Sequence, residues 1–280
     1  MMKLKFILLI PAISAIMAYS QENKGLMIFD EQRLPQYRKI ITIPDVEGFT
    51  VLKCDFHMHT VFSDGTVWPS IRLMEAWKEG LDAISITDHV EGHPHSNEVI
   101  PDNNRPYELV TNDAKKNNVL LIKGAEITRS TPPGHFKAIF IGDASGYITD
   151  RSTNELDREA VSKASAQGAF IFWNHPGWKP NIEGSYEWID FVEDLYKSKM
   201  LHGIEVFNGF GFHMKALDWC IDNGLTVIGS SDSHNLVREV YDTGREYGNR
   251  TMTLVFARDR SASSVRAALE SGRTVAWAGK

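Results

Sequence analysis

Cysteine is scarce in this sequence. Its 280 residues include only Cys54 and Cys220, which stand far apart in the chain. Two distant thiols exclude a disulfide-rich scaffold and a zinc site built on cysteine pairs. Positively charged residues are also fewer than negatively charged ones. The sequence has 30 Lys and Arg residues and 36 Asp and Glu residues, so the formal net charge is -6. Since no basic run occurs beyond the N-terminal segment, we expect no nucleic-acid partner.

The chain begins with a hydrophobic run that is too short to span a membrane. Two lysines precede the apolar residues 6–17, and small residues follow them. A membrane-spanning helix needs about 20 apolar residues, whereas this run is shorter and contains Pro11. The pattern is typical of a secretory signal peptide, residues 1–20, that is cleaved before Gln21. We therefore expect an exported protein, periplasmic or extracellular, without stable membrane association after cleavage; the alternative is a retained anchor.

The full chain of 280 residues has an ordinary globular composition. It is 42% hydrophobic and 24% charged, and its length suits one large domain of the barrel type or two small ones. Residues 21–49 show no sustained hydrophobic period, so we expect an irregular arm there. No repeat, low-complexity tract or linker divides residues 50–280. We therefore expect one domain over that range.

Short apolar runs alternate with helical segments throughout this domain. The predicted strands cover residues 51–59, 83–89, 119–128, 135–142, 169–175, 203–210 and 226–234. The predicted helices cover residues 68–80, 107–118, 154–167, 186–199 and 212–223. A strand, a helix and an apolar piece follow at residues 251–257, 262–271 and 274–278. This alternation predicts the α/β class and, as its architecture, a closed parallel barrel.

Metal-binding residue types recur where the predicted strands end. His57 and His59 end the first strand and point the same way, because strand side chains alternate between faces. The following loop brings Asp64 back towards them. Other strands end in Asp88 and His89, in Glu126, in His175, and in Asp232 and His234. Barrel enzymes carry their active sites at the carboxyl ends of the strands, so we expect these side chains to share one metal-binding mouth.

These residues resemble the PHP (polymerase and histidinol phosphatase) family of metal-dependent phosphoesterases. The resemblance covers about residues 51–234 and follows the family's order of motifs. It rests on His57-x-His59-Thr60 with Ser63-Asp64-Gly65, Thr87-Asp88-His89, Gly124-x-Glu126, Asn174-His175-Pro176 and Asp232-x-His234. It implies a distorted seven-stranded (β/α)7 TIM-like barrel with a three-metal centre.

The resemblance also implies a ligand set, in which Glu126 bridges two ions. The first ion would be held by His57, His59, Glu126 and Asp232. The second would be held by Glu126, His135 and His175, and the third by Asp64, His89 and His234. Nine protein ligands over three ions leave coordination positions open, whereas structural zinc sites are closed by four protein ligands. We expect two to three divalent ions (Zn, Mn or Fe), with water and phosphate oxygens in the open positions.

Two of these assignments depend on local features. Some relatives carry His where this chain has Asp64, and a carboxylate there favours harder ions. His135 begins its predicted strand instead of ending it. It reaches the mouth only if strand 135–142 runs antiparallel to its neighbour after the Pro132-Pro133-Gly134 turn. The alternative is a surface histidine beside a turn. His93 and His95, in the loop beyond His89, are candidates to contact the substrate or to support the metal ligands; the alternative is that they are plain loop residues.

The expected function is hydrolysis of a small organic phosphate ester by a metal-activated water, with a phosphodiester favoured over a monoester. Asp88 is a candidate to hydrogen-bond a metal ligand or to take a proton from that water. His175 or His234 is a candidate to protonate the leaving group, if it is not committed to metal. One alternative is a metal-dependent amidohydrolase or deacetylase, which usually adds a bridging carboxylated lysine. No predicted strand ends in a lysine at the ligand position. The other alternative is a metal-binding module without catalysis. The sequence contains no signal for an oligomeric state.

Overall fold

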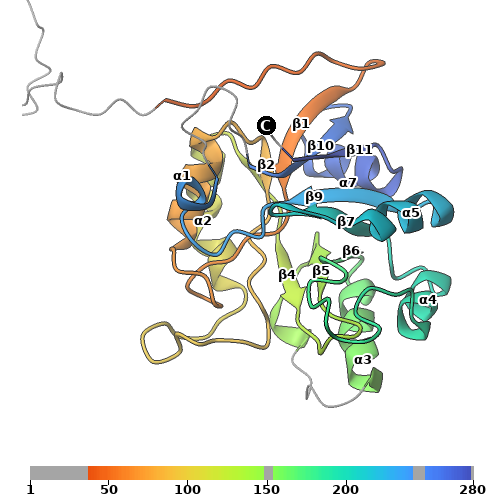
Figure 1. The fold of residues 1–280 in the computed structure, drawn as a ribbon. Helices are drawn as coiled ribbons and strands as arrows, with labels where there is room; N and C mark the ends of the chain where they lie inside the picture. Colours follow the sequence, from red (N-terminus) through yellow and green to blue (C-terminus); the bar gives the residue numbers. More distant parts are fainter. Residues whose placement is uncertain (1–36, 148–153, 242–249, 279–280) are drawn as a thin grey trace, which may run out of the picture. The chain divides into compact units, whose positions relative to one another are not determined.

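The protein is described by a computed structural model over residues 37–147, 154–241 and 250–278 (Figure 1). The expected signal peptide and residues 21–36 of the expected arm lie outside the described residues. Residues 37–49 form no helix or long strand, but Arg38 donates hydrogen bonds to the Trp77 and Leu81 carbonyl oxygens. Within the described residues, every helix is too short or too polar to cross a membrane.

The strands form two sheets (Figure 1). The first has the order β11-β10-β1-β2-β3, with β1 (Thr50–Asp55), β2 (Ala83–Ile84), β3 (Leu120–Leu121), β10 (Met252–Ala257) and β11 (Thr274–Trp277). The second has the order β4-β5-β6-β7-β8, and β9 also pairs with β7. Its strands are β4 (Gly124–Ile127), β5 (Phe136–Ile139), β6 (Phe170–Trp173), β7 (Gly203–Asn208), β8 (Gly211–Phe212) and β9 (Thr226–Ser230).

Strand direction is mixed in both sheets. β1 runs parallel to β2 and antiparallel to β10, while β5 runs antiparallel to both β4 and β6. β6, β7 and β9 are parallel neighbours. The predicted α/β class is confirmed. The seven-stranded barrel is not confirmed, because the described strands form two separate sheets. Two isolated bridges connect the sheets. Met58 and Ser233 pair just beyond the carboxyl ends of β1 and β9, and His89, which follows β2, pairs with Glu126 in β4.

The predicted strand 119–128 is divided between the two sheets. β3 pairs with β2 in the first sheet, and β4 pairs with β5 in the second. The chain crosses over at Gly124, where a β-carbon would clash with the side chains of Ser85 and Thr87. One continuous apolar run therefore contributes a strand to each of the two sheets. Glycine at position 124 makes the close approach at the crossing possible.

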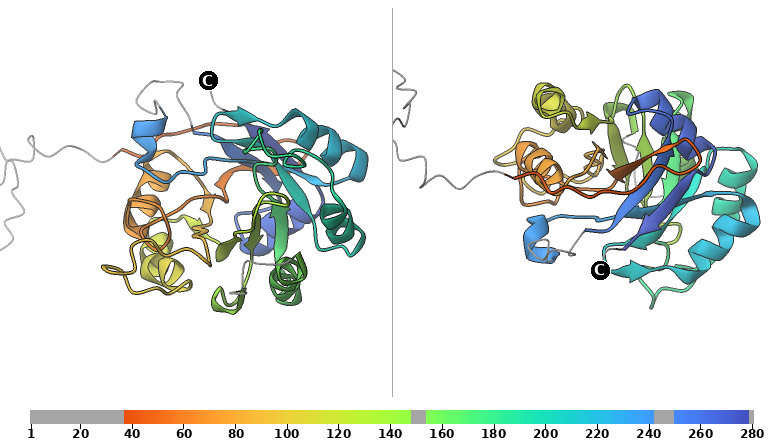
Figure 2. Two further views of the ribbon diagram at one scale, coloured as in Figure 1. Left: turned by 60° about the horizontal axis from the view of Figure 1, so that its bottom comes forward. Right: turned by 90° about the horizontal axis from the view of Figure 1, so that it is seen from above.

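The helices lie outside the sheets (Figures 1 and 2). They are α1 (Pro69–Lys78), α2 (Arg105–Lys116), α3 (Asn154–Ala166), α4 (Asp190–Lys197), α5 (Met214–Asn223), α6 (Val237–Val240) and α7 (Ala262–Glu270), with a 3-10 turn at Ser145–Tyr147. Both α1 and α2 carry proline in their first turn, where its missing N–H is not needed. In both figures α1 and α2 lie side by side, away from α3 and α4.

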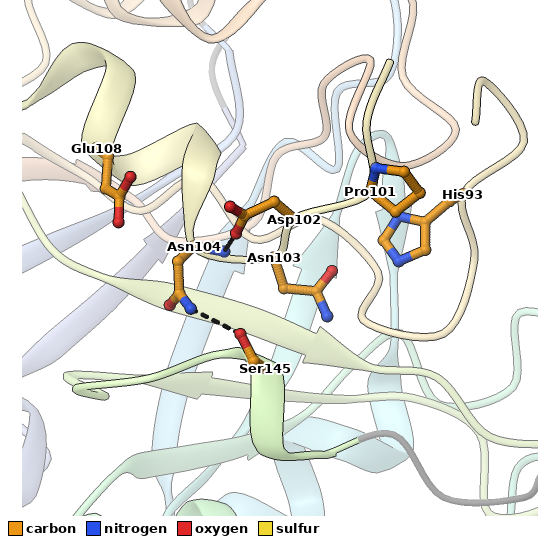
Figure 3. A pocket seen from close by; sticks show the side chains of 7 residues that line it. All are labelled: His93, Pro101, Asp102, Asn103, Asn104, Glu108 and Ser145. Atoms are coloured by element: carbon orange, nitrogen blue, oxygen red, sulfur yellow. Dashed lines mark hydrogen bonds between the residues drawn. The ribbon is translucent and has the colours of Figure 1, made fainter. Parts of the chain in front are cut away.

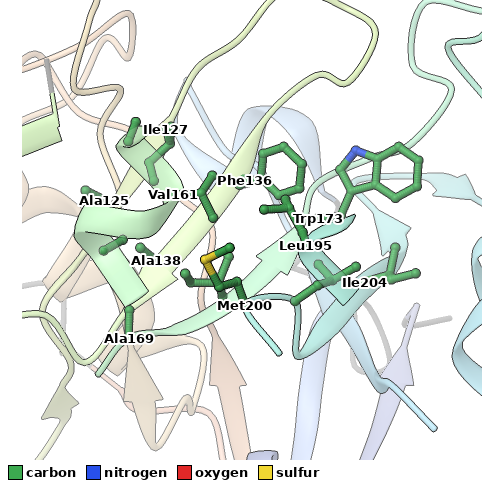
Figure 4. Close-up of a cluster of buried hydrophobic side chains, with 14 of the residues drawn as sticks. Ala125, Ile127, Phe136, Ala138, Val161, Ala169, Trp173, Leu195, Met200 and Ile204 are labelled. Atoms are coloured by element: carbon green, nitrogen blue, oxygen red, sulfur yellow. The ribbon is translucent and has the colours of Figure 1, made fainter. Parts of the chain in front are cut away.

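Side-chain alternation in the second sheet separates an apolar face from an inward face that carries charge. Ala125, Ile127, Phe136 and Ala138 pack in a buried cluster with α3 and α4 residues (Figure 4). Their neighbours on β4 and β5, including Glu126, point the other way. Deeper inside, Phe56 and Phe172 belong to a second buried cluster drawn from both sheets. The inward charges therefore lie near an apolar layer and at the carboxyl ends of several strands.

Candidate metal centre

The His57-Met58-His59 motif follows β1 and is fully buried. Backbone hydrogen bonds join it to the segment after β9: the Asp232 N–H donates to the His57 carbonyl, and the His59 N–H donates to the Ser233 carbonyl, both at 3.0 Å. The Arg72 guanidinium of α1 also donates to the carbonyl oxygens of His59, at 2.9 Å, and Ser233, at 2.8 Å. Two distant sequence motifs are therefore fixed against each other by main-chain contacts.

Four overlapping groups of side chains could each hold a metal ion. They are His57, His59 and Asp232; His57, Glu126 and His175; His89, Glu126 and His135; and His59, Asp64, His89 and His234. In each group the possible ligand atoms lie within 4.8 Å of one another. All nine predicted ligands occur in these groups, but the grouping differs from the expected one. His175 shares a group with His57 and not with His135, His135 shares one with His89, and His59 also joins the Asp64 group. Their binding of metal stays a prediction.

The donor atoms of these groups suit divalent cations. Nε2 of His57 lies 3.1 Å from Nε2 of His59 and 2.8 Å from Oδ1 of Asp232. The same Oδ1 lies 3.2 Å from Nε2 of His59, so two imidazole nitrogens and a buried carboxylate oxygen converge on one point. Buried polar atoms need partners, and a cation at that point would satisfy all three. Imidazole and carboxylate donors without thiolate fit Zn, Mn or Fe.

Glu126 on β4 lies at the junction of the groups. Its Oε1 is 2.8 Å from Nδ1 of His135 and accepts a hydrogen bond from Asn174 Nδ2 at 2.9 Å. Its Oε2 is 3.1 Å from Nε2 of His59. His135 reaches Glu126 because β5 runs antiparallel to β4. The antiparallel arrangement on which the assignment of His135 depended is therefore confirmed.

Asp64 approaches the cluster from the loop after the first motif. Its Oδ1 lies 3.2 Å from Nε2 of His234 and 3.5 Å from Nε2 of His89, and its side chain is 47% exposed. The next residue must be glycine, because a β-carbon at Gly65 would lie 2.7 Å from the backbone carbon of His59. This close approach turns the loop back and places the Asp64 carboxylate at the open side of the cluster.

Charges within the cluster shift the pKa values of its histidines in opposite directions. Burial alone would lower the pKa of His57, but the negative charges of Asp232 and Glu205 outweigh burial and raise it well above its usual value. Burial lowers the pKa of His59 to about 4, and nearby positive charge on Lys137 adds to the effect. Burial likewise lowers the pKa of His175 to about 4. A neutral imidazole is the form that binds a metal.

The carboxylates of the cluster remain ionised. Burial would raise the pKa of Glu126, but the charges of Lys137 and His89 lower it well below its usual value. The pKa of Asp232 is also lowered well below its usual value, because His57 offsets burial. These carboxylates are therefore available to cations at neutral pH.

Two predicted ligands have left-handed backbone conformations. The φ angle is 27° at His175 and 51° at Asp232. Such angles are uncommon outside glycine and cost of order 1 kcal/mol or more each. They turn the chain just after β6 and just after β9, so both side chains face the cluster. The pattern of apolar residues in the sequence does not predict either turn.

Asp88 does not belong to any of the four groups. Its Oδ1 accepts hydrogen bonds from the Thr60 N–H and the Ser63 hydroxyl, and its Oδ2 accepts one from the Thr60 hydroxyl, all at 2.6 Å. The carboxylate therefore fixes the turn that carries Asp64. The predicted role in proton transfer stays a prediction.

Glu205 was not predicted from the sequence, although it touches a predicted ligand. It is fully buried on β7, and its Oε1 lies 2.7 Å from Nδ1 of His57. Its Oε2 accepts hydrogen bonds from the His175 N–H and the Asn208 amide, both at 2.9 Å. A carboxylate on Nδ1 turns Nε2 of the imidazole towards a metal. The sequence feature that could have identified Glu205 is a single charged residue between the apolar residues Ile204 and Val206.

Lys137 was also not predicted from the sequence, because it lies inside its strand and not at the strand's end. It lies within β5, is fully buried, and forms an ion pair with Oε2 of Glu126. Glu126 and Lys137 are direct cross-strand partners. The i, i+2 spacing from His135 places both side chains on one face and could have identified it.

A cavity of about 400 Å³ lies in the loop region that precedes α2 (Figure 3). It is lined by His93, Pro101, Asp102, Asn103, Asn104, Glu108 and Ser145, none of which is a predicted ligand. Nδ1 of His93 lies 2.9 Å from the Phe62 carbonyl oxygen, and Nε2 of His95 lies 3.2 Å from that of Gly65. Both histidines therefore brace the loop that carries Asp64.

An exposed indole stands beside two predicted ligands. The Trp178 ring centroid lies 5.6 Å from that of His135 and 5.5 Å from that of His175, and the residue is 46% exposed. Nζ of Lys179 lies 4.3 Å from the same ring centroid. The cluster is therefore flanked by an accessible aromatic surface and a cation.

Comparison with solved structures places this architecture among metal-dependent phosphoesterases. A two-domain protein from Bacteroides vulgatus containing a predicted PHP-like metal-dependent phosphoesterase is 46% identical, with a TM-score of 0.82 over 88% of this chain and 70% of that chain. A putative metal-dependent phosphoesterase from Bifidobacterium adolescentis is 17% identical, with a TM-score of 0.51 over 78% and 96%, and shows similarity of fold alone. No family profile and no curated protein sequence matches this chain. At 46% identity over most of both chains, the protein belongs to the PHP-like metal-dependent phosphoesterase family.

Proposed function

We propose that this protein hydrolyses a small organic phosphodiester, with a phosphomonoester as the second choice, through two to three divalent ions held by the nine predicted ligands. The observation that carries the proposal is the convergence of all nine ligands in four overlapping groups. Membership of a phosphoesterase family supports the same reaction class. Bound ions would supply the nucleophile by lowering the pKa of a coordinated water, and would neutralise charge on the phosphoryl group.

The protein's own residues would hold and orient this chemistry. Glu205 fixes the ring of His57 through Nδ1 and leaves Nε2 facing Asp232. The open side of the cluster, at Asp64 and His234, is the accessible side for a phosphate, because these side chains are 47% and 33% exposed. The half-exposed Trp178 offers an apolar surface to the organic part of the ester.

Where His234 is not committed to a metal ion, proton transfer to the leaving group is assigned to it in preference to His175. The pKa of His234 is raised, since the carboxylates of Asp64 and Asp232 outweigh burial. His175 is buried, and its pKa is lowered to about 4, so it is a poor proton donor near neutral pH. Asp88 would contribute through the Thr60 turn that it holds.

The expected barrel is part of the proposal. The strands β1, β2, β4, β5, β6, β7 and β9 would form a distorted seven-stranded barrel around the cluster. Support comes from the two isolated bridges, one between the segments that follow β1 and β9 and one between the segment that follows β2 and Glu126 in β4. The ladders β4-β5-β6-β7 and β7-β9 supply the rest of the circuit.

The amidohydrolase alternative usually adds a bridging carboxylated lysine. Among the described residues, Lys137 reaches the cluster, but its ammonium group pairs with Glu126 and donates to the Thr87 carbonyl oxygen at 3.3 Å. A carbamate would replace this cation with an anion facing Glu126 and a carbonyl oxygen. The contacts of Lys137 therefore favour the phosphoesterase.

A substrate panel tests the proposal. Purified protein supplied with Mn²⁺ or Zn²⁺ is expected to release nitrophenol from bis(p-nitrophenyl) phosphate faster than from p-nitrophenyl phosphate. It is expected to release no nitroaniline from p-nitroacetanilide. His57→Ala is expected to abolish release. His202→Ala is the control, because His202 precedes β7, at the end opposite the cluster. Anilide hydrolysis without phosphoester hydrolysis would support the amidohydrolase, and metal binding without either reaction would support a non-catalytic module.

Export is a separate proposal that rests on residues 1–20 of the sequence. The protein recovered from its host is expected to lie outside the cytoplasm and to begin near Gln21, as N-terminal sequencing would show. A soluble mature protein that retains Met1 would contradict export.

A further inference from the structure

Lys137 places a positive charge inside the candidate metal centre. The residue is fully buried within β5, and its ammonium group pairs with Oε2 of Glu126. Its second acceptor is the Thr87 carbonyl oxygen, at 3.3 Å. A buried lysine is rare unless it is paired. Lys137 is therefore built into the cluster and is not a surface residue that reaches it by chance.

The oxygen that Lys137 contacts is the one shared by three predicted ligands. Oε2 of Glu126 lies 3.1 Å from Nε2 of His59, 3.3 Å from Nε2 of His57 and 3.5 Å from Nδ1 of His89. A carboxylate oxygen offers two lone-pair positions. Because the ammonium group occupies one of them, Oε2 retains one position for a metal ion.

The charge of the cluster gives an independent reason for a limited number of ions. Four carboxylates lie within 4.0 Å of ring nitrogens of predicted ligands: Asp64, Glu126, Glu205 and Asp232. Lys137 neutralises one of their four negative charges. Two divalent ions and one hydroxide would then bring the cluster to neutrality, whereas a third divalent ion would leave it with excess positive charge.

We propose that Lys137 acts as a permanent internal cation that limits tight binding to two divalent ions. The third ion, which binds weakly, would be held by the group that contains Asp64, His89 and His234. Asp64 is half exposed there, and this group does not include Glu126. Lys137 is thus a positioning residue for charge, and it distinguishes this centre from the three-metal centre that the resemblance implies.

Metal content tests the role of Lys137. The parent protein, loaded with excess Zn²⁺ or Mn²⁺ and passed through a desalting column, is expected to retain two ions per chain by elemental analysis. Lys137→Met keeps the length of the side chain and removes its charge. Since removing a charge close to a divalent ion is worth at least about tenfold in affinity, this variant is expected to bind the third ion at least about tenfold more tightly in a competition assay with a chelator.

Two variants separate charge from packing. Lys137→Arg keeps the positive charge and is expected to retain two ions. Lys123→Met changes a lysine whose Nζ donates to the Gly142 carbonyl oxygen outside the cluster, and it is also expected to retain two. If Lys137→Met does not fold, as judged by circular dichroism, Lys137→Gln replaces it and the parent's metal content remains decisive.

Several results would overturn the inference. These are three tightly bound ions in the parent, an unchanged third affinity in the folded Met or Gln variant, or a carbamate signal at Lys137 in ¹³C NMR with labelled bicarbonate. The inference rests on the proposed function only in requiring that divalent ions bind this cluster. Because its readout is metal content, a protein that binds two ions but hydrolyses no phosphoester would contradict the proposed function and leave the role of Lys137 supported.

Discussion

Nδ1 of His57 lies 2.7 Å from Oε1 of Glu205, and both residues are fully buried. This contact fixes the ring so that Nε2 faces Asp232. Glu205→Gln keeps the size of the side chain but removes its charge, and it forces an amide group against hydrogen-bond donors at Ser230, His175 and Asn208. We expect metal affinity to fall about 10- to 100-fold with the fold retained. Chelator competition measures this, with the exposed Glu187→Gln as control; equal affinities would contradict the role of Glu205.

His57→Ala and Asp232→Ala are expected to lower bound metal and to abolish phosphoester hydrolysis. Both side chains face the cluster and do not belong to the packed apolar layers. Circular dichroism should therefore remain that of the parent protein. Elemental analysis and a nitrophenyl ester assay measure the two effects. Full activity in either variant would remove that residue from the site.

Asp64→His is expected to shift metal preference without emptying the whole cluster. A carboxylate supplies a hard oxygen ligand, which favours Mn²⁺ or Mg²⁺ more than an imidazole does. The His57, Glu126 and His175 group does not include Asp64 and should persist. The ratio of Mn²⁺-supported to Zn²⁺-supported activity should therefore fall relative to the parent. An unchanged ratio with unchanged metal content would show that Asp64 lies outside the metal shell.

Metal binding is expected to release protons near neutral pH. The pKa of His57 is raised well above its usual value, since Asp232 and Glu205 outweigh burial, so the metal-free ring carries a proton that an ion must displace. Affinity should therefore increase as pH rises. Calorimetry in two buffers of different ionisation enthalpy counts the protons released, and zero release at pH 7 would contradict the prediction.

The same shifts determine how the stability of the metal-free protein depends on pH. The raised pKa of His57 gives stability that is fully present below its unfolded pKa of about 6.5 and is lost as pH rises through the folded value. The lowered pKa of Glu126 has the opposite effect, because its stability is present above about pH 4 and is lost as pH falls through the folded value.

Glycine at position 232 is expected to be more stable than alanine in the metal-free protein. Asp232 has a φ angle of 51°, which glycine adopts without steric cost and alanine does not. The free energy of unfolding of Asp232→Gly should exceed that of Asp232→Ala by about 1 kcal/mol. Urea denaturation measures the difference. Equal stabilities would mean that the left-handed turn is absent from the variant without its carboxylate.

Sequence patterns predict most of the elements and bring the predicted ligands to one place, because strand ends and i, i+2 spacing are local signals. Residues 68–80 were expected as a helix and form α1 (Pro69–Lys78), and His135 reaches Glu126 across the expected antiparallel pair. Two sheets were not predicted, since the apolar run from Val119 to Thr128 carries no mark of the crossing at Gly124 other than glycine itself.

Long-range electrostatics account for what the sequence did not reveal. Glu205 and Lys137 lie inside strands, where a single charge reads as an interruption of an apolar run. Their partners, His57 and Glu126, are identified only when the chain is folded, and His57 is 148 positions from Glu205. The left-handed angle at His175 is likewise imposed by tertiary contacts and not by residue type.

The two isolated bridges lie where bound metal would restrain the backbone. His89 and Glu126 form one bridge and are themselves predicted ligands, and Ser233 in the other bridge lies between Asp232 and His234. Ions held by these side chains would oppose separation of the two sheets at the same points. The amide hydrogens of His59 and Glu126, which donate to the Ser233 and Asp88 carbonyl oxygens, should therefore exchange with solvent more slowly as the centre fills. Hydrogen exchange at these amides would then report metal loading of the centre in the absence of substrate.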